Sequence, residues 1–272
     1  MMKIVRYILW SFVTLAGVSF AGCQADTDTH PEPQPVKGVI AVQAQSEMDN
    51  ESNPTSEPGK NTKSNDNETL TYVLEVWTRE AEARRVLHKA VNGGLTSGAE
   101  FDITLIPGIY DFLFWADYGN GHYVSTDLRK VTVATEAYRP DIRNDAFACV
   151  LKEVDWNENT SYNATLKRCV ALMNIHNTAA FDKKNAVTMV YNGLYRVYDV
   201  LTQEVSDPLY DLRVSFPETT VGSTLIGEDF FFVPAEGDVM SFSVSVGDVT
   251  KSLDDIPLKS NYSTNITCFL QP

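Results

Sequence analysis

Hydrophobic and polar residues alternate along residues 101–105, and a longer apolar run occupies residues 109–117. In the first run every second residue is apolar, which is the period-two pattern of a strand with one buried face. The second run is apolar on both faces, which carry Tyr110, Phe112 and Phe114 on one side and Ile109, Leu113 and Trp115 on the other. We therefore expect residues 109–117 to lie sealed between two layers of a β-sandwich.

Pro107-Gly108 joins the two runs. Proline has the φ angle needed at the first central position of a type II turn, and glycine accepts the positive φ of the second position. Because a type II turn splays the strands of a tight hairpin, this junction favours placing the two strands in different sheets.

Short apolar runs separated by turn residues fill most of the chain from residue 36 onward. Residues 83–91 are interpreted as a strand, although their Ala, Glu, Arg and Leu favour helix locally. No long helical period occurs, so the many short strands predict an all-β sandwich or barrel. The other expected strands are 36–44, 70–77, 130–135, 146–154, 164–175, 187–191, 194–200, 212–216, 230–233, 240–246 and 264–270.

The composition predicts two domains. The chain has 272 residues, of which 43% are hydrophobic, and this suffices for two small β domains. Composition turns polar around residues 178–185, where we place the boundary. An N-terminal β-sandwich domain then covers residues 36–182 and includes a flexible polar loop over residues 45–68. A C-terminal β-sandwich domain covers residues 183–272.

The first 22 residues have the pattern of an export signal. Lys3 and Arg6 form a basic start, and residues 8–20 form an apolar stretch that is too short to span a bilayer comfortably. We predict a signal peptide over residues 1–22 and a secreted or surface location for the remainder.

The signal ends in Phe20-Ala21-Gly22-Cys23, which resembles a bacterial lipobox. The resemblance implies that Cys23 becomes the lipidated first residue of the mature protein, and several acyl chains hold a protein durably on a membrane. An ordinary secretory signal followed by a coincidental cysteine is the alternative. Residues 23–35 are polar and rich in proline, and we expect them to form a tether.

The net charge disfavours one class of partner, and the cysteine count limits the number of disulfides. The formal net charge is −14 and the isoelectric point is near 4.7, so binding to a phosphate backbone is disfavoured and no nucleic-acid partner is expected. Cys149, Cys169 and Cys268 remain once Cys23 carries lipid. At most one internal disulfide can then form, and buried free thiols are an equally good interpretation.

Catalytic motifs are missing from the sequence. It contains no nucleophile elbow, zinc-protease motif, phosphate loop or dinucleotide fingerprint, and no Cys or His pair has metal-ligand spacing. We therefore expect neither enzyme activity nor a cofactor. Asp111 and Asp117 flank Trp115 and are the carboxylates to consider for a glycosidase pair, because the fold assembles such pairs. The alternative is that they mark the ends of a strand.

Three aromatic residues are candidates for glycan contacts. Tyr118 and Tyr123 lie in a Gly/Asn-rich loop, and Trp156 lies in the acidic, Asn-rich segment 155–163, which is expected to be an exposed hairpin tip. Their flat rings and polar edges suit stacking on sugar rings. Local packing is the alternative for each of them.

Several segments together resemble a known family. Pro-Gly-Ile-Tyr-Asp-Phe-Leu-Phe-Trp-Ala-Asp over residues 107–117 resembles the Pro-Gly-Xaa-Tyr … Trp-Ala-Asp strand of Bacteroidetes fimbrillin-like lipoproteins, the superfamily of FimA/FimB-type pilus subunits. Residues 71–77, 166–171 and 256–267 agree more loosely. The resemblance covers most of residues 36–272 in order.

The resemblance implies two transthyretin-like β-sandwich domains, lipid-dependent export to the outer membrane, and assembly of subunits into fimbriae by strand addition. It also implies a surface protease that cuts after Arg or Lys to remove the first strand, and Lys37, Lys60 and Lys63 lie where such a cut could fall. The sequence ends at Pro272, just after the last expected strand. This favours an anchor or accessory subunit over a shaft subunit.

The leading hypothesis is therefore a lipid-anchored fimbrial subunit or cell-adhesion protein at the outer membrane, whose partners are other fimbrial subunits. The alternative is a glycan-binding surface lipoprotein that does not polymerise, with a host or glycan ligand held by the three aromatic candidates. The two differ in whether the chain occurs in surface fibres.

Overall fold

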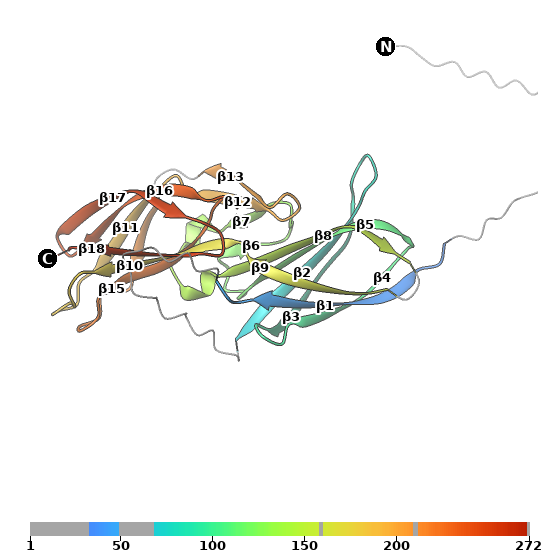
Figure 1. The fold of residues 1–272 in the computed structure, drawn as a ribbon, viewed down its shortest axis with the longest axis horizontal. Helices are drawn as coiled ribbons and strands as arrows, with labels where there is room; N and C mark the ends of the chain where they lie inside the picture. Colours follow the sequence, from blue (N-terminus) through green and yellow to red (C-terminus); the bar gives the residue numbers. More distant parts are fainter. Residues whose placement is uncertain (1–32, 49–67, 158–159, 209–211, 271–272) are drawn as a thin grey trace, which may run out of the picture. The chain divides into compact units, whose positions relative to one another are not determined.

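The computed structural model describes residues 33–48, 68–157, 160–208 and 212–270. Apart from Pro33, these residues belong to one compact unit that starts at Gln34. The described part of the chain is built from strands and two short 3₁₀ helices, η1 (Thr135–Ala137) and η2 (Ile142–Asn144). None of its helices is long and apolar enough to cross a membrane. The predicted all-β fold is confirmed (Figure 1).

The first sheet has seven strands in the order β3-β2-β5-β8-β9-β1-β4. Its members are β1 (Val36–Gln45), β2 (Thr69–Thr78), β3 (Arg85–Gly94), β4 (Ala99–Leu105), β5 (Gly108–Asp117), β8 (Ala146–Trp156) and β9 (Thr160–Arg168). Strands β8 and β9 pair at only two positions, Phe147 with Arg168 and Ala148 with Lys167. The sheet bends at this corner, so strands of both halves line one core.

This first core takes one face of every long strand in the sheet. Its largest members are fully buried side chains of β1, β2, β4, β5 and β8, namely Ile40, Leu70, Tyr72, Leu74, Phe101, Phe112, Phe114, Phe147 and Trp156. Their period-two spacing is the reason that the sequence pattern located these strands.

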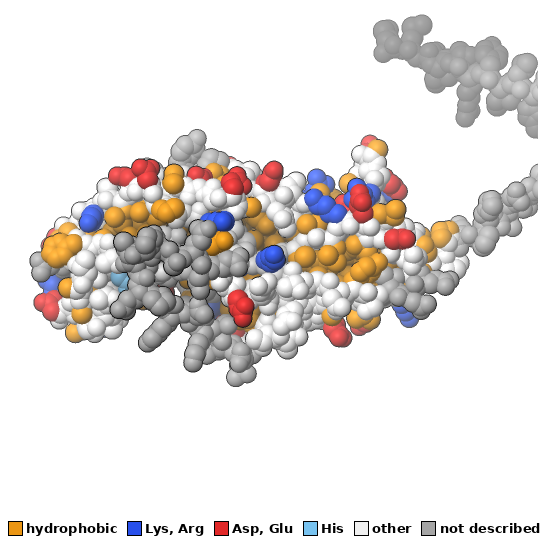
Figure 2. Space-filling model, viewed as in Figure 1, with side chains coloured by type: hydrophobic (Ala, Val, Ile, Leu, Met, Phe, Trp, Pro, Cys, Tyr) orange, Lys and Arg blue, Asp and Glu red, His pale blue; other side chains and the backbone are white. Residues whose placement is uncertain are grey.

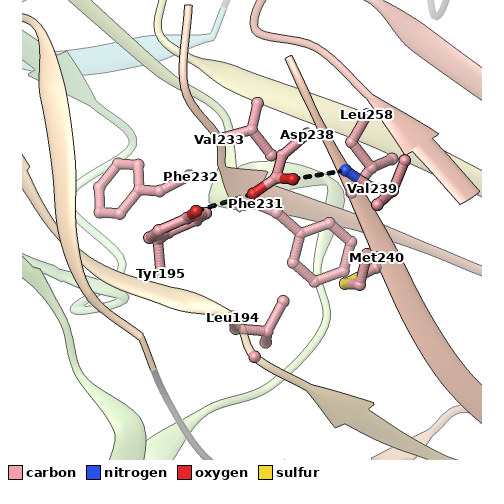
Figure 3. Close-up of a pocket in the computed structure, with 10 residues that line it drawn as sticks. Leu194, Tyr195, Phe231, Phe232, Val233, Asp238, Val239, Met240 and Leu258 are labelled. Atoms are coloured by element: carbon pink, nitrogen blue, oxygen red, sulfur yellow. Dashed lines mark hydrogen bonds between the residues drawn. The ribbon is translucent and has the colours of Figure 1, made fainter. Parts of the chain in front are cut away.

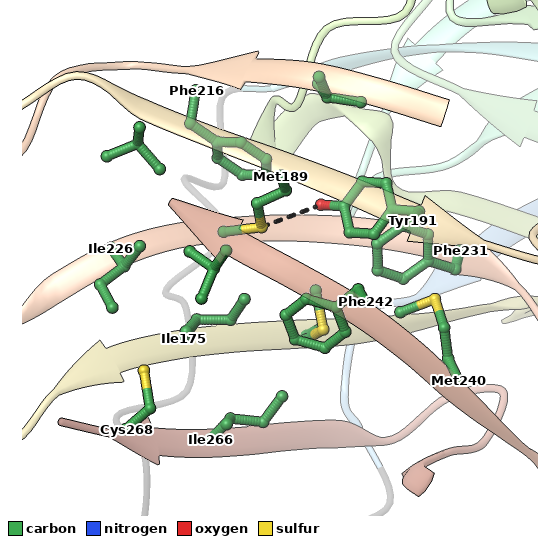
Figure 4. Close-up of a cluster of buried hydrophobic side chains, with 14 of the residues drawn as sticks. Ile175, Met189, Tyr191, Phe216, Ile226, Phe231, Met240, Phe242, Ile266 and Cys268 are labelled. Carbon is green, nitrogen blue, oxygen red and sulfur yellow. Dashed lines mark hydrogen bonds between the residues drawn. The ribbon is translucent and has the colours of Figure 1, made fainter. Parts of the chain in front are cut away.

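Two further sheets enclose a second core. One has the order β18-β10-β15-β12-β7-β6, with β13 paired to β12; the other has the order β14-β11-β16-β17. Figure 4 shows the core side chains between them, among them Met189, Tyr191, Phe231 and Phe242. The strands are β6 (Tyr123–Val124), β7 (Val131–Val133), β10 (Val170–Asn177), β11 (Val187–Asn192), β12 (Tyr195–Asp199), β13 (Glu204–Pro208), β14 (Leu212–Phe216), β15 (Leu225–Phe232), β16 (Asp238–Val246), β17 (Val249–Leu258) and β18 (Ser263–Cys268).

A third core lies on the other face of β5. There Leu113 and Trp115 pack with side chains of β10, β12 and β15, including Phe232, whose ring centre is 6.2 Å from that of Trp115. Strand β5 thus has a hydrophobic core on each face, as its sequence predicts. The exception is Ile109 at its start, which is 57% exposed.

Two sequence predictions about strand placement are wrong. Strands β4 and β5 belong to the same sheet, although they are not neighbours in it. The run 164–175, expected as one strand, is divided at Cys169 into β9 and β10, which lie in different sheets. The amide of buried Cys169 still donates to the carbonyl oxygen of Ala146, in register with the β8–β9 pairs, whereas the next residue, Val170, already pairs with Phe232 of β15 in the other sheet.

Strands β6, β7 and β10 precede the predicted domain boundary and lie in the same sheet as β12, β15 and β18, which follow it. The domain boundary after residue 182 stays a prediction.

Cys149, Cys169 and Cys268 are free thiols, and burial raises the pKa of each. The signal peptide, Cys23 and most of the predicted tether and flexible loop lie outside the described residues.

Candidate functional site: the seat of the first strand

Strand β1 is inserted between β4 and β9 and is hydrogen-bonded along both edges. It runs antiparallel to β4 over Val36–Val42 and parallel to β9 over Gly38–Gln45. Because β1 comes from the start of the described chain, no tight turn ties it to either neighbour. Its contacts with the sheet are therefore of the kind that a separate strand could make.

Alternate side chains of β1 enter the first core. Ile40, Val42 and Ala44 are 0%, 3% and 5% exposed, whereas Lys37 and Gln43 point outward into solvent. Full burial of a Val or Ile side chain contributes about 1.5–3 kcal/mol. Burial of Ile40 and Val42 therefore contributes about 3–6 kcal/mol to the free energy with which this strand is bound.

Strand β4 reaches β1 through a glycine that no other residue can replace without strain. Gly98 has φ of +70°, and a Cβ atom there would lie 2.0 Å from the carbonyl oxygen of Val42. The missing side chain lets the β3–β4 turn approach the backbone of β1, and Gln43 adds a hydrogen bond of 2.7 Å from Nε2 to the carbonyl oxygen of Thr96.

Side-chain donors hold the two ends of β1. The indole Nε1 of Trp156 donates to the carbonyl oxygen of Val36 at 3.1 Å. At the other end Nη2 of Arg168 donates to the carbonyl oxygen of Ser46, also at 3.1 Å. These bonds fix the register of the strand as well as its position.

Arg168 is itself held by a buried ion pair. Its Nε and Nη2 atoms each lie 2.7 Å from a carboxylate oxygen of Asp145, and its guanidinium group stacks on the ring of Phe147 at 5.2 Å. Burial raises the pKa of Asp145, and the charge of Arg168 opposes this rise. Removing one partner leaves the other charge buried and unpaired, which makes the pair sensitive to substitution.

The predicted processing sites differ in what a cut would do. Lys37 lies within β1, so a cut after it would leave Gly38–Gln45 in the sheet. Lys60 and Lys63 lie outside the described residues, between β1 and β2 in the sequence. A cut at either of them would break the covalent link between β1 and the rest of the fold, to which β1 would then be held by non-covalent contacts alone.

The three aromatic candidates for glycan contacts are placed in packing roles. Trp156 is fully buried, and Tyr123 is buried with its hydroxyl donating to the carbonyl oxygen of Asn144 at 2.5 Å. Tyr118 is half-buried and packs against the first core. The geometry does not support sugar stacking by Trp156 or Tyr123, because neither presents a ring face to solvent.

Asp111 and Asp117 do not form a glycosidase pair. They are six residues apart on one strand, hence about 20 Å apart, whereas the two carboxyl groups of a glycosidase are about 5–9.5 Å apart. Asp111 binds Arg79, and Asp117 accepts hydrogen bonds of 2.6 Å from Trp115 Nε1 and the amide of Gly119. Both carboxylates stabilise local structure.

Sequence reasoning overlooked the buried carboxylate of Glu75 on β2. It is fully buried and accepts hydrogen bonds from Trp77 Nε1, Arg85 Nη1 and the amide of Leu128, and it contacts His88 Nδ1 at 2.9 Å. The loop after β6 is thereby joined to the first sheet. The sequence feature that could have predicted its burial is the position of a glutamate inside an apolar run.

Asp229 on β15 is a second overlooked carboxylate. It is fully buried and accepts hydrogen bonds from the hydroxyl groups of Tyr138 at 2.8 Å and Tyr191 at 3.1 Å. Burial raises its pKa to about 7, although these hydrogen bonds oppose the rise. Beside it, His122 contacts the ring of Tyr138, and burial lowers the pKa of His122 to about 4.

A small pocket opens between β12, β15, β16 and the end of β17 (Figure 3). Its volume is about 20 Å³, which is room for about one water molecule. The hydroxyl of Tyr195 donates to Oδ2 of Asp238 across its rim at 2.7 Å. In the described residues no three His, Cys, Asp or Glu side chains are grouped so that they could hold a metal ion.

The model of a family of unknown function, DUF6562, matches residues 33–270. The chain belongs to this family. Because the family is one of unknown function, membership by itself assigns no activity to the chain. A comparison with curated proteins found no match.

Solved structures share the fold of this DUF6562 protein. A candidate polysaccharide-binding protein from Bacteroides thetaiotaomicron has a TM-score of 0.55 and 10% identity, over 87% of this chain and 92% of its own. A candidate adhesin from Bacteroides ovatus has a TM-score of 0.51 and 10% identity, over 81% of this chain and 78% of its own. The tip fimbrial protein Mfa3 from Porphyromonas gingivalis has a TM-score of 0.49 and 14% identity, over 81% of each chain. The expected likeness to surface proteins of Bacteroidetes is confirmed at the level of the fold by the first two of these structures.

Proposed function

We propose that this DUF6562 protein is a lipid-anchored subunit of a surface fimbria or adhesin assembly, of anchor or accessory type, which joins other subunits by strand addition. The observation that carries the proposal is the seat of β1. A strand bonded along both edges, with alternate side chains in a core and both ends held by side-chain donors, leaves a matching groove when it departs. That groove would accept a strand from another subunit.

The position of the candidate cuts supports an anchor role. A cut after Lys60 or Lys63 would release β1 together with Cys23, the residue predicted to carry lipid. An uncut chain keeps its groove filled and its lipid attached. It therefore remains at the outer membrane, and a strand from another subunit is accepted only by chains from which β1 has departed.

Exchange of β1 tests strand addition. In the mature protein a recognition site for a specific protease replaces residues 58–63, and the cut protein is incubated with a fluorescent peptide of residues 34–48. We expect the peptide to be incorporated stoichiometrically, while the same peptide carrying Val42→Asp is not, because a carboxylate would enter the core. Equal incorporation of both peptides, or of neither, contradicts the proposal.

Lipid anchoring needs a separate experiment in the native cell. We expect labelled palmitate to be incorporated into the wild-type protein and not into Cys23→Ala. Labelling that survives this substitution would contradict lipidation at Cys23.

A second candidate function is a glycan-binding surface lipoprotein that does not polymerise. The structural likeness to a protein described as polysaccharide-binding favours it. Surface fibres isolated from the native cell separate the two functions. A fimbrial subunit occurs in these preparations, whereas the second candidate is found in the membrane fraction alone.

A further inference from the structure

Strand β4 has a free edge on the side away from β1. It is an edge strand of the first sheet, and among the described residues β1 is the one strand that pairs with it. The carbonyl oxygen of Asp102 is reached from the side of β3, by Lys89, so it faces away from β1. Alternate residues of an antiparallel strand point their backbone groups to the same side, so Glu100 and Thr104 face the same way. Such a row of backbone groups is a template for an added strand.

Lys89 of β3 is bonded to the middle of this free edge. Its Nζ donates to the carbonyl oxygen of Asp102 at 2.8 Å. Lys89 pairs with Leu74, which is fully buried in the first core, so its side chain leaves β3 on the face that the core occupies. The amine therefore crosses the opening between β3 and β4 instead of extending directly into solvent.

The first core is incompletely covered between β3 and β4. In the part of the chain that the structure describes, these two strands are joined by a single isolated bridge, between Gly94 and Gly98. Leu87 and Val91 flank Lys89 on the same face of β3 and pack against the first core, yet both are only partly buried. An added strand would therefore find apolar contacts here as well as free backbone groups.

Other edge strands are protected by their length or by an irregularity. Strand β6 has two residues and β14 has five, while β17 has ten but is interrupted by a register shift opposite Met240 and Phe242. Strand β4 has seven residues, all in regular register with β1. Charge alone does not shield the first sheet, because hydrophobic side chains gather over it on the face that Figure 2 shows.

We propose that Lys89 makes β4 an acceptor on one edge only, so that a strand from a partner subunit adds in the seat of β1 and not along the outer edge of β4. A second strand laid along that edge would find the Asp102 carbonyl already bonded, and it would have to bury an ammonium group away from water. Inward-pointing charged residues on edge strands protect sheets in this way. Lys89 thus acts as a positioning residue that decides where a strand adds.

The inference rests on the proposed function, because it selects the place where a strand from another subunit adds. Its test does not require exchange of β1. In an uncut chain β1 fills its seat, so that only the outer edge of β4 is open to an added peptide. Failure of β1 exchange in the cut protein would refute strand addition in the seat and leave the result with the uncut protein unchanged.

Binding of the fluorescent peptide of residues 34–48 to the uncut mature protein, followed by anisotropy, tests the role of Lys89. This segment already pairs with β4 in the fold, so its backbone suits the other edge of the same strand. We expect no saturable binding to the wild type or to Lys89→Arg, which keeps a donor. Lys89→Met keeps the long side chain without the amine, and we expect it to bind one peptide at least about ten-fold more tightly than the wild type.

Two controls fix the place of binding. Lys89→Met/Asp102→Pro should lose the gain, because proline is tolerated where the N–H faces away from the partner strand but gives an added strand no donor. Lys251→Met makes the same change at an exposed position of the edge strand β17 and should bind like the wild type. Thermal unfolding checks that each variant is folded, and Lys89→Ala replaces Lys89→Met if that variant is not.

Three results would overturn the proposal. The first is equal binding of the peptide by the wild type and Lys89→Met. The second is binding by Lys89→Arg or Lys251→Met that is as tight as binding by Lys89→Met. The third is tight binding that survives the addition of Asp102→Pro.

Discussion

Substitution of Asp229 by asparagine should make the protein more stable at alkaline pH. The carboxyl group is fully buried, and the side chains that donate to it, Tyr138, Tyr191 and Asn144, are all neutral. Its pKa of about 7 in the folded chain compares with about 3.9 for an unfolded aspartate. The folded state thus binds the proton more tightly, so stability falls as pH rises from about 4 to about 7.

The size of this effect follows from the two pKa values. Each pKa unit corresponds to about 1.4 kcal/mol, and the cost of ionising Asp229 in the folded state approaches about 4 kcal/mol above pH 7. Between pH 5 and pH 8 the free energy of unfolding should fall by about 2.5 kcal/mol through this group alone. Asparagine cannot ionise, and its carbonyl oxygen can accept from the tyrosine hydroxyls. Its NH2 group cannot accept the hydrogen bond that the amide of Phe230 donates to Asp229, and this cost is the same at every pH.

His122 makes the free energy of unfolding change with pH in the opposite direction. Its folded pKa of about 4 lies below the ordinary value of about 6.5, so the unfolded state binds the proton more tightly. Stability from this residue rises by about 2 kcal/mol between pH 5 and pH 8. The two slopes nearly cancel in the wild type, and the difference between variant and wild type isolates Asp229.

Urea denaturation of the wild type and Asp229→Asn at pH 5, 6, 7 and 8 measures this difference. We expect the free energy of unfolding of the variant, relative to the wild type, to increase by about 2.5 kcal/mol from pH 5 to pH 8. Asp182→Asn is the matched control, because it makes the same substitution at an exposed position. A difference for Asp229→Asn that is independent of pH would refute the assigned pKa shift.

Three further predictions concern single residues. His122→Gln should remove the rise of about 2 kcal/mol in stability between pH 5 and pH 8, and a variant that keeps it would show that another group titrates. Arg168→Met should cost about 3–5 kcal/mol, because Asp145 stays buried without its partner; hydrogen exchange should show faster opening at the Ser46 end of β1, and equal exchange would contradict the clamp. Gly98→Ala should cost about 1–3 kcal/mol or more because of its positive φ and its approach to β1; thermal unfolding measures this, and an unchanged Tm would refute the close contact.

The alternation of side chains along each strand could be read from the sequence. Strands β1, β2, β4 and β5 were located because burial of one face repeats every two residues, a property of the strand itself. The burial of Leu113 and Trp115 opposite Phe112 and Phe114 followed from the same pattern. Strands β13 and β17 were overlooked because they are edge strands with mostly polar residues.

The candidate site was only partly visible. Val36–Gln45 was expected as a first strand, but its insertion between β4 and β9 was not, because those partners lie about 60 and 120 residues further along the chain. Polar neighbours made Trp156 look exposed. Its ring is buried because its Nε1 reaches the carbonyl oxygen of Val36 across the bend between β8 and β9.

The sequence by itself therefore determined the fold class, most of the strands and which of their side chains face a core, because side-chain period is a local property. Only the tertiary structure decided which strands pair, where the run around Cys169 divides, and that Lys89 of β3 reaches the backbone of β4 at Asp102. Pairing and register join segments that are distant in sequence, and they are chosen by the packing of whole sheets against one another.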